Sequence, residues 1–134
     1  MLVPEYWILD TGNKKLGKVK IRVNKETSPN TVQAIDSKLP MDVKMTRWGD
    51  ELYGSIDVDA EAENPVEECE VGDVAYWLDG PALCILFGRT PASTGPNPKL
   101  ISPGNIVGKV EAKNMDAFKE INVLNGRLMK AKGN

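Results

Sequence analysis

Short segments of alternating polar and apolar residues constrain this chain more than any other feature of its sequence. In KVKIRV, residues 18–23, lysine and arginine alternate with valine and isoleucine, and residues 41–48 and 51–58 follow the same rule. A period of two is that of a β-strand with one face buried and the other in water. Short strands at this spacing, separated by turn residues, indicate a barrel or a sandwich. The chain is therefore expected to be mainly β, with seven or eight strands.

One firm helix is predicted among these strands. Ser28 belongs to the residue types that cap a helix N-terminus, and Pro29 suits the first helical position. Apolar residues then recur at helical spacing, and Pro40 ends the pattern. The sequence therefore predicts a helix that begins at Pro29 and ends before Pro40.

The second half of the chain contains further strands and longer connections. Residues 82–88 are apolar at almost every position, which is typical of a central strand buried on both faces. Residues 89–105 are rich in proline, glycine and serine and predict a long surface loop, a kind of segment that is often functional. The other expected elements are an exposed acidic connection over 59–73, strands over 73–78 and 106–112, a short helix over 114–121 capped by Asn114 with Met115 and Phe118 facing inward, and a basic tail or edge element over 122–134.

Length and charge limit the class of protein. The chain has 134 residues, which fits a single domain, residues 1–134, with its core between residues 5 and 121. A net charge of −2 argues against a general nucleic-acid-binding protein, whose surface normally carries a basic excess. No run approaches the ~18 consecutive apolar residues of a membrane span, and the first residues lack the pattern of a signal peptide. We therefore expect a cytoplasmic protein that binds neither nucleic acid nor membrane, while its oligomeric state is left open.

The available side chains remove several kinds of chemistry. The chain has no histidine, which excludes Ser-His-Asp and Cys-His catalytic groups and removes the commonest metal ligand. Cys84 lies in an apolar strand and is expected in the core, while Cys69 lies among carboxylates, which raise the pKa of a thiol and oppose nucleophilic chemistry. Two separated cysteines cannot supply a zinc site. Neither a metal nor a cofactor is expected.

The segment RWGDELYG, residues 47–54, is the candidate functional site. It combines a guanidinium, two aromatic rings and two carboxylates between two predicted strands. Residues 48–51 predict a tight turn. Alternation places Arg47 on the apolar face of the first strand, and Glu51 and Tyr53 on the solvent-facing side of the second.

Two groups of motifs resemble those of known proteins. The opening residues, with Leu16-Gly17-Lys18-Val19 in a hairpin and Pro29-Asn30-Thr31 at a helix start, look like the opening of a cyclophilin. The later motifs RWGDELYG, VGDVAYWLDGPALCILFGRTP and SPGNIVGKV resemble the small cyclophilin-like domain family of archaea and bacteria, whose members are mostly unassigned in function. The resemblance covers most of residues 6–111. It implies a closed, mostly antiparallel eight-stranded barrel with a helix plugging one end.

Cyclophilins are peptidyl-prolyl isomerases, so the resemblance implies a candidate activity. The reaction needs an apolar pocket for the proline ring and a guanidinium that stabilises the twisted amide. Cyclophilins place this arginine on the strand after the first helix, where Arg47 lies in this chain. The histidines of the cyclophilin motif are missing, and Gln33 lies in the predicted helix, so Arg47 alone is carried over as a candidate catalytic residue.

Several interpretations of this segment remain open. In one, Arg47 binds a carboxylate or other anion bidentately at the mouth of a barrel pocket occupied by a proline-containing peptide or a small molecule. In another, Arg47 is structural and pairs with Asp50 or Glu51, since a charge on an apolar face needs a partner. An interaction or oligomerisation module that uses an exposed barrel edge is a further alternative to the isomerase. The candidate ligand-binding residues are Arg47, Trp48, Tyr53, Phe87, Arg89 and Thr90.

Overall fold

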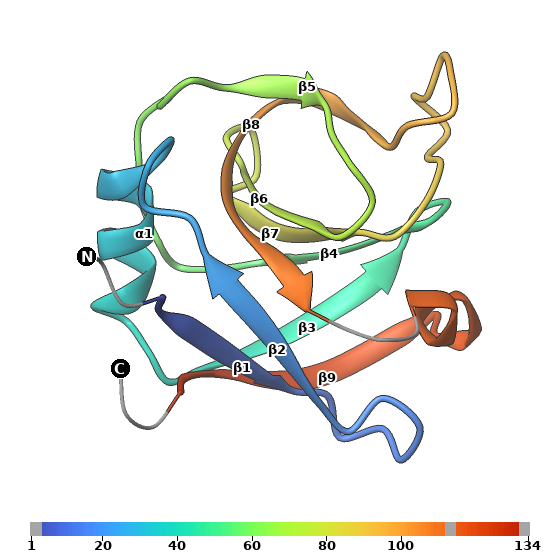
Figure 1. Ribbon diagram of the computed structural model, residues 1–134, viewed down its shortest axis with the longest axis horizontal. Helices are drawn as coiled ribbons and strands as arrows, with labels where there is room; N and C mark the ends of the chain where they lie inside the picture. Colours follow the sequence, from blue (N-terminus) through green and yellow to red (C-terminus); the bar gives the residue numbers. More distant parts are fainter. Residues whose placement is uncertain (1–3, 112–114, 132–134) are drawn as a thin grey trace.

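A closed barrel of antiparallel strands forms the body of the protein. The structure, a computed structural model, describes residues 4–111 and 115–131. Within them the strands are β1 (Tyr6–Asp10), β2 (Lys18–Val23), β3 (Met41–Arg47), β4 (Glu51–Ser55), β5 (Val66–Glu68), β6 (Asp73–Trp77), β7 (Ala82–Leu86), β8 (Lys99–Glu111) and β9 (Val123–Lys130). Eight of them follow the order β2-β1-β9-β3-β4-β7-β6-β8, and pairing of β2 with β8 closes the barrel (Figure 1). The expected eight-stranded barrel is confirmed, with β5 added as an extra strand on β8.

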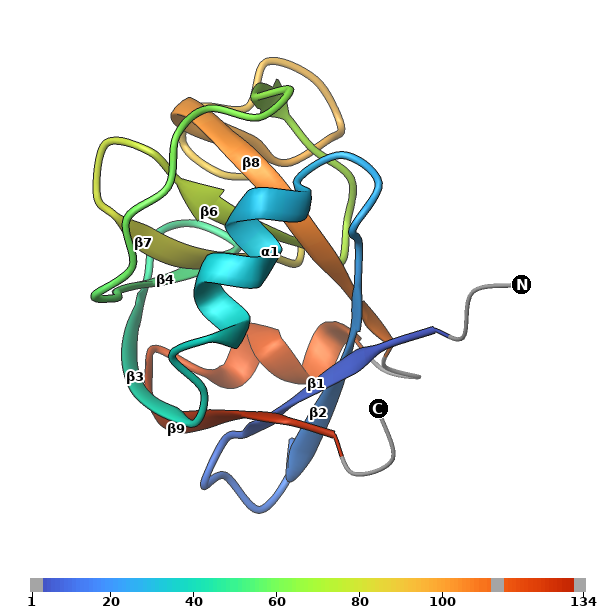
Figure 2. The same cartoon turned by 90° about the vertical axis from the view of Figure 1, so that its left-hand side faces the viewer.

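Two helical segments lie on opposite sides of this barrel. They are α1 (Pro29–Asp36) and the 3₁₀ helix η1 (Met115–Glu120) (Figures 1 and 2). Val32 of α1 and Phe118 of η1 are buried in the barrel core, so the inward position expected for Phe118 is confirmed. Asn114, the expected cap of the short helix, lies outside the described residues. Within the residues that are described, no helix is long and apolar enough to cross a membrane.

The N-terminus of α1 is capped by a residue from a distant segment. Pro29 takes an N-terminal position of the helix, as expected, but the Ser28 hydroxyl makes no capping bond and has no hydrogen-bond partner among the described residues. The Glu63 carboxylate instead accepts hydrogen bonds from the backbone N–H groups of Asn30 at 3.2 Å and Thr31 at 2.6 Å. It satisfies two free N–H groups at the helix end and supplies the negative charge that the helix dipole favours. The expectation that Ser28 caps α1 through its side chain is therefore wrong.

Two expectations for the C-terminal part of the chain are also wrong. Residues 89–105 do not form one long loop, because β8 already begins at Lys99. Residues 122–134 contain β9, which lies between β1 and β3 and is neither a tail nor an edge element. Leu124 and Leu128 of β9 are buried, while its basic side chains occupy the exposed face. The positive charges that suggested a tail thus belong to the solvent-facing side of a central strand.

Apolar residues pack into two cores, one inside the barrel and one on its outer surface. The inner core contains inward-facing residues from all eight barrel strands. The outer cluster lies over β6 and β7, so β7 is covered on both faces, as its apolar sequence predicted. The members of this outer cluster are Cys69, Ala75, Cys84, Leu86 and Leu100.

Candidate functional site

The turn between β3 and β4 is short and is docked on a neighbouring segment. The N–H of Trp48 donates to the carbonyl of Glu51 at 2.8 Å, and the N–H of Glu51 donates back at 3.2 Å. Gly49 has a φ of 60°, a backbone conformation that glycine adopts most readily. The N–H of Asp50 donates to the Arg89 carbonyl at 2.8 Å, which joins the turn to the segment after β7. The tight turn expected over residues 48–51 is confirmed.

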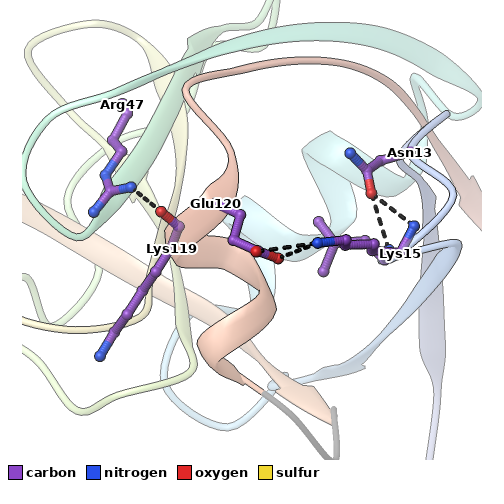
Figure 3. A network of polar contacts seen from close by, with 6 residues as sticks. Asn13, Lys15, Arg47, Lys119 and Glu120 are labelled. Carbon is purple, nitrogen blue, oxygen red and sulfur yellow. Dashed lines mark hydrogen bonds and ion pairs between the residues drawn. The ribbon is translucent and has the colours of Figure 1, made fainter.

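All three guanidinium nitrogens of Arg47 donate hydrogen bonds within the protein itself. Its Nε donates to the Gly49 carbonyl at 2.7 Å, and its Nη2 donates to Asp50 Oδ1 at 2.7 Å in an ion pair. Its Nη1 donates to the carbonyl of Lys119 in η1 (Figure 3). The guanidinium also lies 5.5 Å from the centre of the Phe87 ring. The pairing of Arg47 with Asp50, one of the alternatives left open by the sequence, is therefore present.

The contact between Arg47 and Lys119 adds a polar tie to η1, whose Phe118 is buried in the core and stacks on Phe87. On the other side of this helix, the Glu120 carboxylate forms an ion pair with Lys15 at 3.1 Å (Figure 3). Lys15 lies in the connection between β1 and β2, where the side chain of Asn13 accepts the Lys15 backbone N–H at 2.8 Å. η1 is thus fixed between two turns of the barrel, and Arg47 acts as part of this scaffold.

A small cavity lies beside the turn, on the outer face of the barrel. Its volume is about 260 Å³. Tyr53 is 38% exposed and Ile101 is 61% exposed, so the cavity opens to solvent between them. Its walls come from the turn, from β4, from the end of β6 and from the start of β8. The lining residues are Trp48, Glu51, Tyr53, Trp77, Leu100 and Ile101.

Glu51 contributes a carboxyl group to the wall of this cavity. The residue is 5% exposed, and its Oε1 has no hydrogen-bond partner among the residues described. Burial raises the pKa of Glu51 from 4.5 to about 7, and a hydrogen bond from the Cys84 thiol opposes part of that rise. The expectation that Glu51 faces solvent is wrong. Glu51 lies opposite Leu86 of β7 in the strand register. Leu86 belongs to the outer cluster, which buries this part of the outer face.

The two cysteines of the outer cluster are free, buried thiols. Burial, together with the nearby charges of Asp73, Glu51 and Glu68, raises the pKa of Cys69 to about 12. Burial also raises the pKa of Cys84 well above its usual value. The effect expected from the carboxylates around Cys69 is confirmed in direction. Among the described residues, no three His, Cys, Asp or Glu side chains are placed to hold a metal ion.

The structure brings together only some of the residues singled out from the sequence. Trp48 and Tyr53 line the cavity, whereas Arg47, Phe87, Arg89 and Thr90 do not. Phe87 is 3% exposed and stacks on Phe118 with ring centres 5.6 Å apart. Thr90 is buried and donates to the backbone of Lys99, while Arg89 is exposed.

Sequence reasoning missed four of the residues that line the cavity. They are Glu51, Trp77, Leu100 and Ile101. One observation could have indicated part of the set. Residues 82–88 are apolar on both faces, which requires a cover over the outer face of that strand. Residues on the neighbouring strand that point the same way, Glu51 among them, would share the cover.

A larger hollow lies elsewhere, where β2 and β8 meet β5. Its volume is about 770 Å³, and its lining mixes acidic, basic and polar side chains. Two ion pairs form between residues of its lining, Lys25 with Glu5 at 2.6 Å and Lys109 with Glu70 at 3.1 Å. No aromatic residue is among its described lining residues, whereas three aromatic residues line the smaller cavity, which is therefore the better candidate site despite its size.

Comparisons with known proteins agree with this architecture. The family model described as cyclophilin-like matches residues 13–126 of the chain. The solution structure of the hypothetical protein AF2241 from Archaeoglobus fulgidus is similar to it, with a TM-score of 0.79 and 28% sequence identity over 96% of each chain. No curated protein matches the chain significantly.

Proposed function

This chain belongs to the cyclophilin-like family, and we propose that it is a binding domain whose outer cavity accepts one apolar group of a peptide or small molecule. The observation that carries the proposal is the lining, in which two indoles and a phenol surround a cavity next to the exposed Ile101. Drug-sized ligands fill cavities of roughly 300–1,000 Å³. A cavity of about 260 Å³ suits a single side chain or a group of similar size.

Exposure and order of the lining support the proposal. A contiguous patch of exposed apolar side chains indicates a binding surface more often than a single exposed apolar side chain does. Trp77 is held in place because its indole N–H donates to Ser102 Oγ at 2.7 Å, and the Ser102 hydroxyl donates to Asp79. The backbone of Trp48 is fixed by two hydrogen bonds with Glu51 in the turn. A lining that is already ordered loses little conformational freedom when a ligand binds.

The charges at the site favour a ligand that is not an anion. Among the described lining residues, Glu51 is the one with an acidic or basic side chain, and its carboxylate repels an anion. Arg47, expected to bind an anion, has its guanidinium engaged by Gly49, Asp50 and Lys119. Its contribution to the proposed site is indirect, since it holds the turn that carries Trp48.

The two other functions considered have less support. An isomerase needs its guanidinium at the apolar pocket, and Arg47 does not line the cavity. An edge-pairing module needs an open strand edge. The barrel is closed, and in the part of the chain that the structure describes the unpaired edge is that of β5, a strand of three residues.

Binding can be tested by nuclear magnetic resonance of the three tryptophan indole N–H groups. Trp48 and Trp77 report on the cavity, while Trp7 is buried on β1 with its indole bound to Asp36 at 2.9 Å and serves as an internal reference. The probes are the N-acetyl methylamides of leucine, phenylalanine, proline and trimethyllysine. We expect at least one probe at millimolar concentration to shift the Trp48 and Trp77 signals and to leave Trp7 unchanged.

Two exposed residues provide a matched pair of variants. Ile101 is 61% exposed at the cavity, and Val123 is 55% exposed on β9, outside the cavity. Ile101→Ser should weaken binding of the responding probe, whereas Val123→Ser should not. Unchanged Trp48 and Trp77 signals with all four probes would overturn the proposed function, as would equal losses of binding in the two variants.

A further inference from the structure

We propose that the outer cavity selects a methylated ammonium group, held by the aromatic faces of Trp48, Tyr53 and Trp77 and by the carboxylate of Glu51. This inference rests on the binding function proposed above and names the chemistry of its ligand. The group could belong to a methylated lysine of a peptide or to a small quaternary amine, and both present the same cation. The occupant would be an organic cation in either case.

The aromatic lining provides the first argument. The faces of aromatic rings carry negative electrostatic potential, and they attract cations that lie within about 6 Å of the ring centre, with tryptophan the strongest of the three types. Two indoles and one phenol line this cavity, which is small enough for one methylated ammonium group. No lysine or arginine belongs to the lining residues described, so no cation of the protein competes for these rings.

The position of Glu51 provides the second argument. Its Oε1 is buried without a hydrogen-bond partner among the described residues, an arrangement that costs free energy in the empty protein. A cation in the cavity would lie beside this carboxyl and would stabilise its charged form. Methylated ammonium groups have few or no N–H donors, so a nearby negative charge suits them better than a set of hydrogen-bond acceptors.

The groups described around Glu51 stabilise its charge only through a hydrogen bond from the Cys84 thiol, and burial outweighs that bond. Cys84 on β7 and Cys69 before β6 contact this region, and burial keeps both as neutral thiols by raising the pKa of each. Asp73 on β6 and Glu68 on β5 act on Cys69 with the same sign of charge. A bound cation favours the charged form of Glu51 and would lower its pKa. Because this pKa is about 7 in the empty cavity, binding would release protons near neutral pH.

The test compares a cation with a neutral molecule of the same shape. The probes are N-acetyl-trimethyllysine methylamide and its analogue in which a tert-butyl group replaces the trimethylammonium group. At pH 8 we expect the cation to bind about tenfold more tightly than the analogue, the effect of roughly one cation–π contact with a nearby charge. The preference should shrink at pH 6, where Glu51 is protonated. Tetramethylammonium as a third probe shows whether the cation alone is sufficient or the lysine stem is required.

Variants separate this inference from the proposed function. Glu51→Gln should remove most of the cation preference and its pH dependence while still binding the neutral analogue. Tyr53→Leu, at a partly exposed position, should reduce the preference and retain an apolar wall. Equal binding of the two probes by the wild-type protein would overturn the cation proposal and leave the binding function standing. If neither probe binds at any pH while the leucine, phenylalanine or proline probe still shifts the Trp48 and Trp77 signals, the cation proposal fails and the binding function stands; both fail only when none of the probes shifts these signals.

Discussion

Replacing Glu51 with glutamine should change how the stability of the empty protein depends on pH. Burial raises the pKa of Glu51 from 4.5 to about 7 in the folded protein. Below pH 4.5 the carboxyl is protonated in both the folded and the unfolded chain, so its charge costs nothing. Between pH 4.5 and about 7 the unfolded chain loses the proton first, and the free energy of unfolding falls as the pH rises. Above about pH 7 the loss is complete.

The size of the effect follows from the same two values. The difference between 4.5 and about 7, at about 1.36 kcal/mol for each pKa unit, corresponds to about 3 kcal/mol. The amide of glutamine has its own cost of burial, but that cost does not vary with pH. As the pH rises from 4 to 8, the free energy of unfolding of the Glu51→Gln variant should therefore increase by about 3 kcal/mol relative to that of the wild-type protein. With a urea m-value of about 2 kcal/mol/M, the two unfolding midpoints should move by about 1.5 M relative to each other.

Urea denaturation at a series of pH values, followed by circular dichroism, measures this difference. Other groups with shifted pKa values, such as Asp73 and Glu63, are present in both proteins and cancel in the comparison. Glu61→Gln is the control, because Glu61 is exposed and its side chain should contribute no such trend. A difference between wild type and the Glu51 variant that stays constant from pH 4 to pH 8 would refute the reasoning.

Three further predictions concern the scaffold and the alternative activity. Arg47→Ala should lower the free energy of unfolding by about 2 kcal/mol, because it removes charged hydrogen bonds to two carbonyl groups and one carboxylate. Arg127→Ala is the control, because it removes only an exposed ion pair and should lower the free energy of unfolding by less than about 1 kcal/mol in the same urea assay. In a coupled proline-isomerisation assay we expect wild-type rates equal to buffer, and a rate above buffer that a folded Arg47→Ala variant lacks would instead establish the isomerase. Glu63→Gln should destabilise the protein at pH 7, because hydrogen bonds from Thr31 and the start of α1 stabilise the Glu63 carboxylate and lower its pKa. The difference in stability from wild type should shrink as the pH falls below 4.5, where this charge is lost. Glu61→Gln should show neither effect.

Much of the fold could be predicted because alternation reports directly on burial. The patterns at residues 18–23 and 41–48 correspond to strands whose inward residues Val19, Ile21, Val43 and Met45 are buried, while Val23 at the end of its strand is half-buried. Alternation identifies strands but says nothing of how a sheet closes. The choice of a barrel over a sandwich came from the resemblance, and the pairing of β2 with β8 bears it out.

The errors in the fold have separate physical causes. β9 has the same alternation as the strands that were recognised, but its lysines and arginine drew attention to charge instead of period. The cap of α1 comes from Glu63, which is 35 positions after Ser28 in the numbering, and no local pattern predicts such a partner. Local reasoning finds residues of the right type for a cap and cannot exclude a better acceptor from elsewhere in the chain.

The candidate site could be predicted only in part from the sequence, for a related reason. Alternation assigns Glu51 to the outer face of β4, and that assignment is correct, since Leu52 faces the inner core. Whether an outer face is wet depends on what covers it, and here the cover comes from the outer cluster and from the start of β8. Those contacts are long-range, so the burial of Glu51 and the position of Trp77 opposite the turn appear only in the folded chain.

The segment RWGDELYG is divided between two tasks that its sequence does not separate. Arg47 and Asp50 clamp the turn and η1, while Trp48, Glu51 and Tyr53 line the cavity. Because Trp48 lies inside the clamped turn, loosening the clamp should also disorder one wall of the cavity. Variants of the clamp should therefore lose stability and binding together, whereas Tyr53→Leu should change ligand preference at nearly constant stability. That pattern would distinguish a scaffold arginine from a ligand-binding one, for which binding would be lost without any loss of stability.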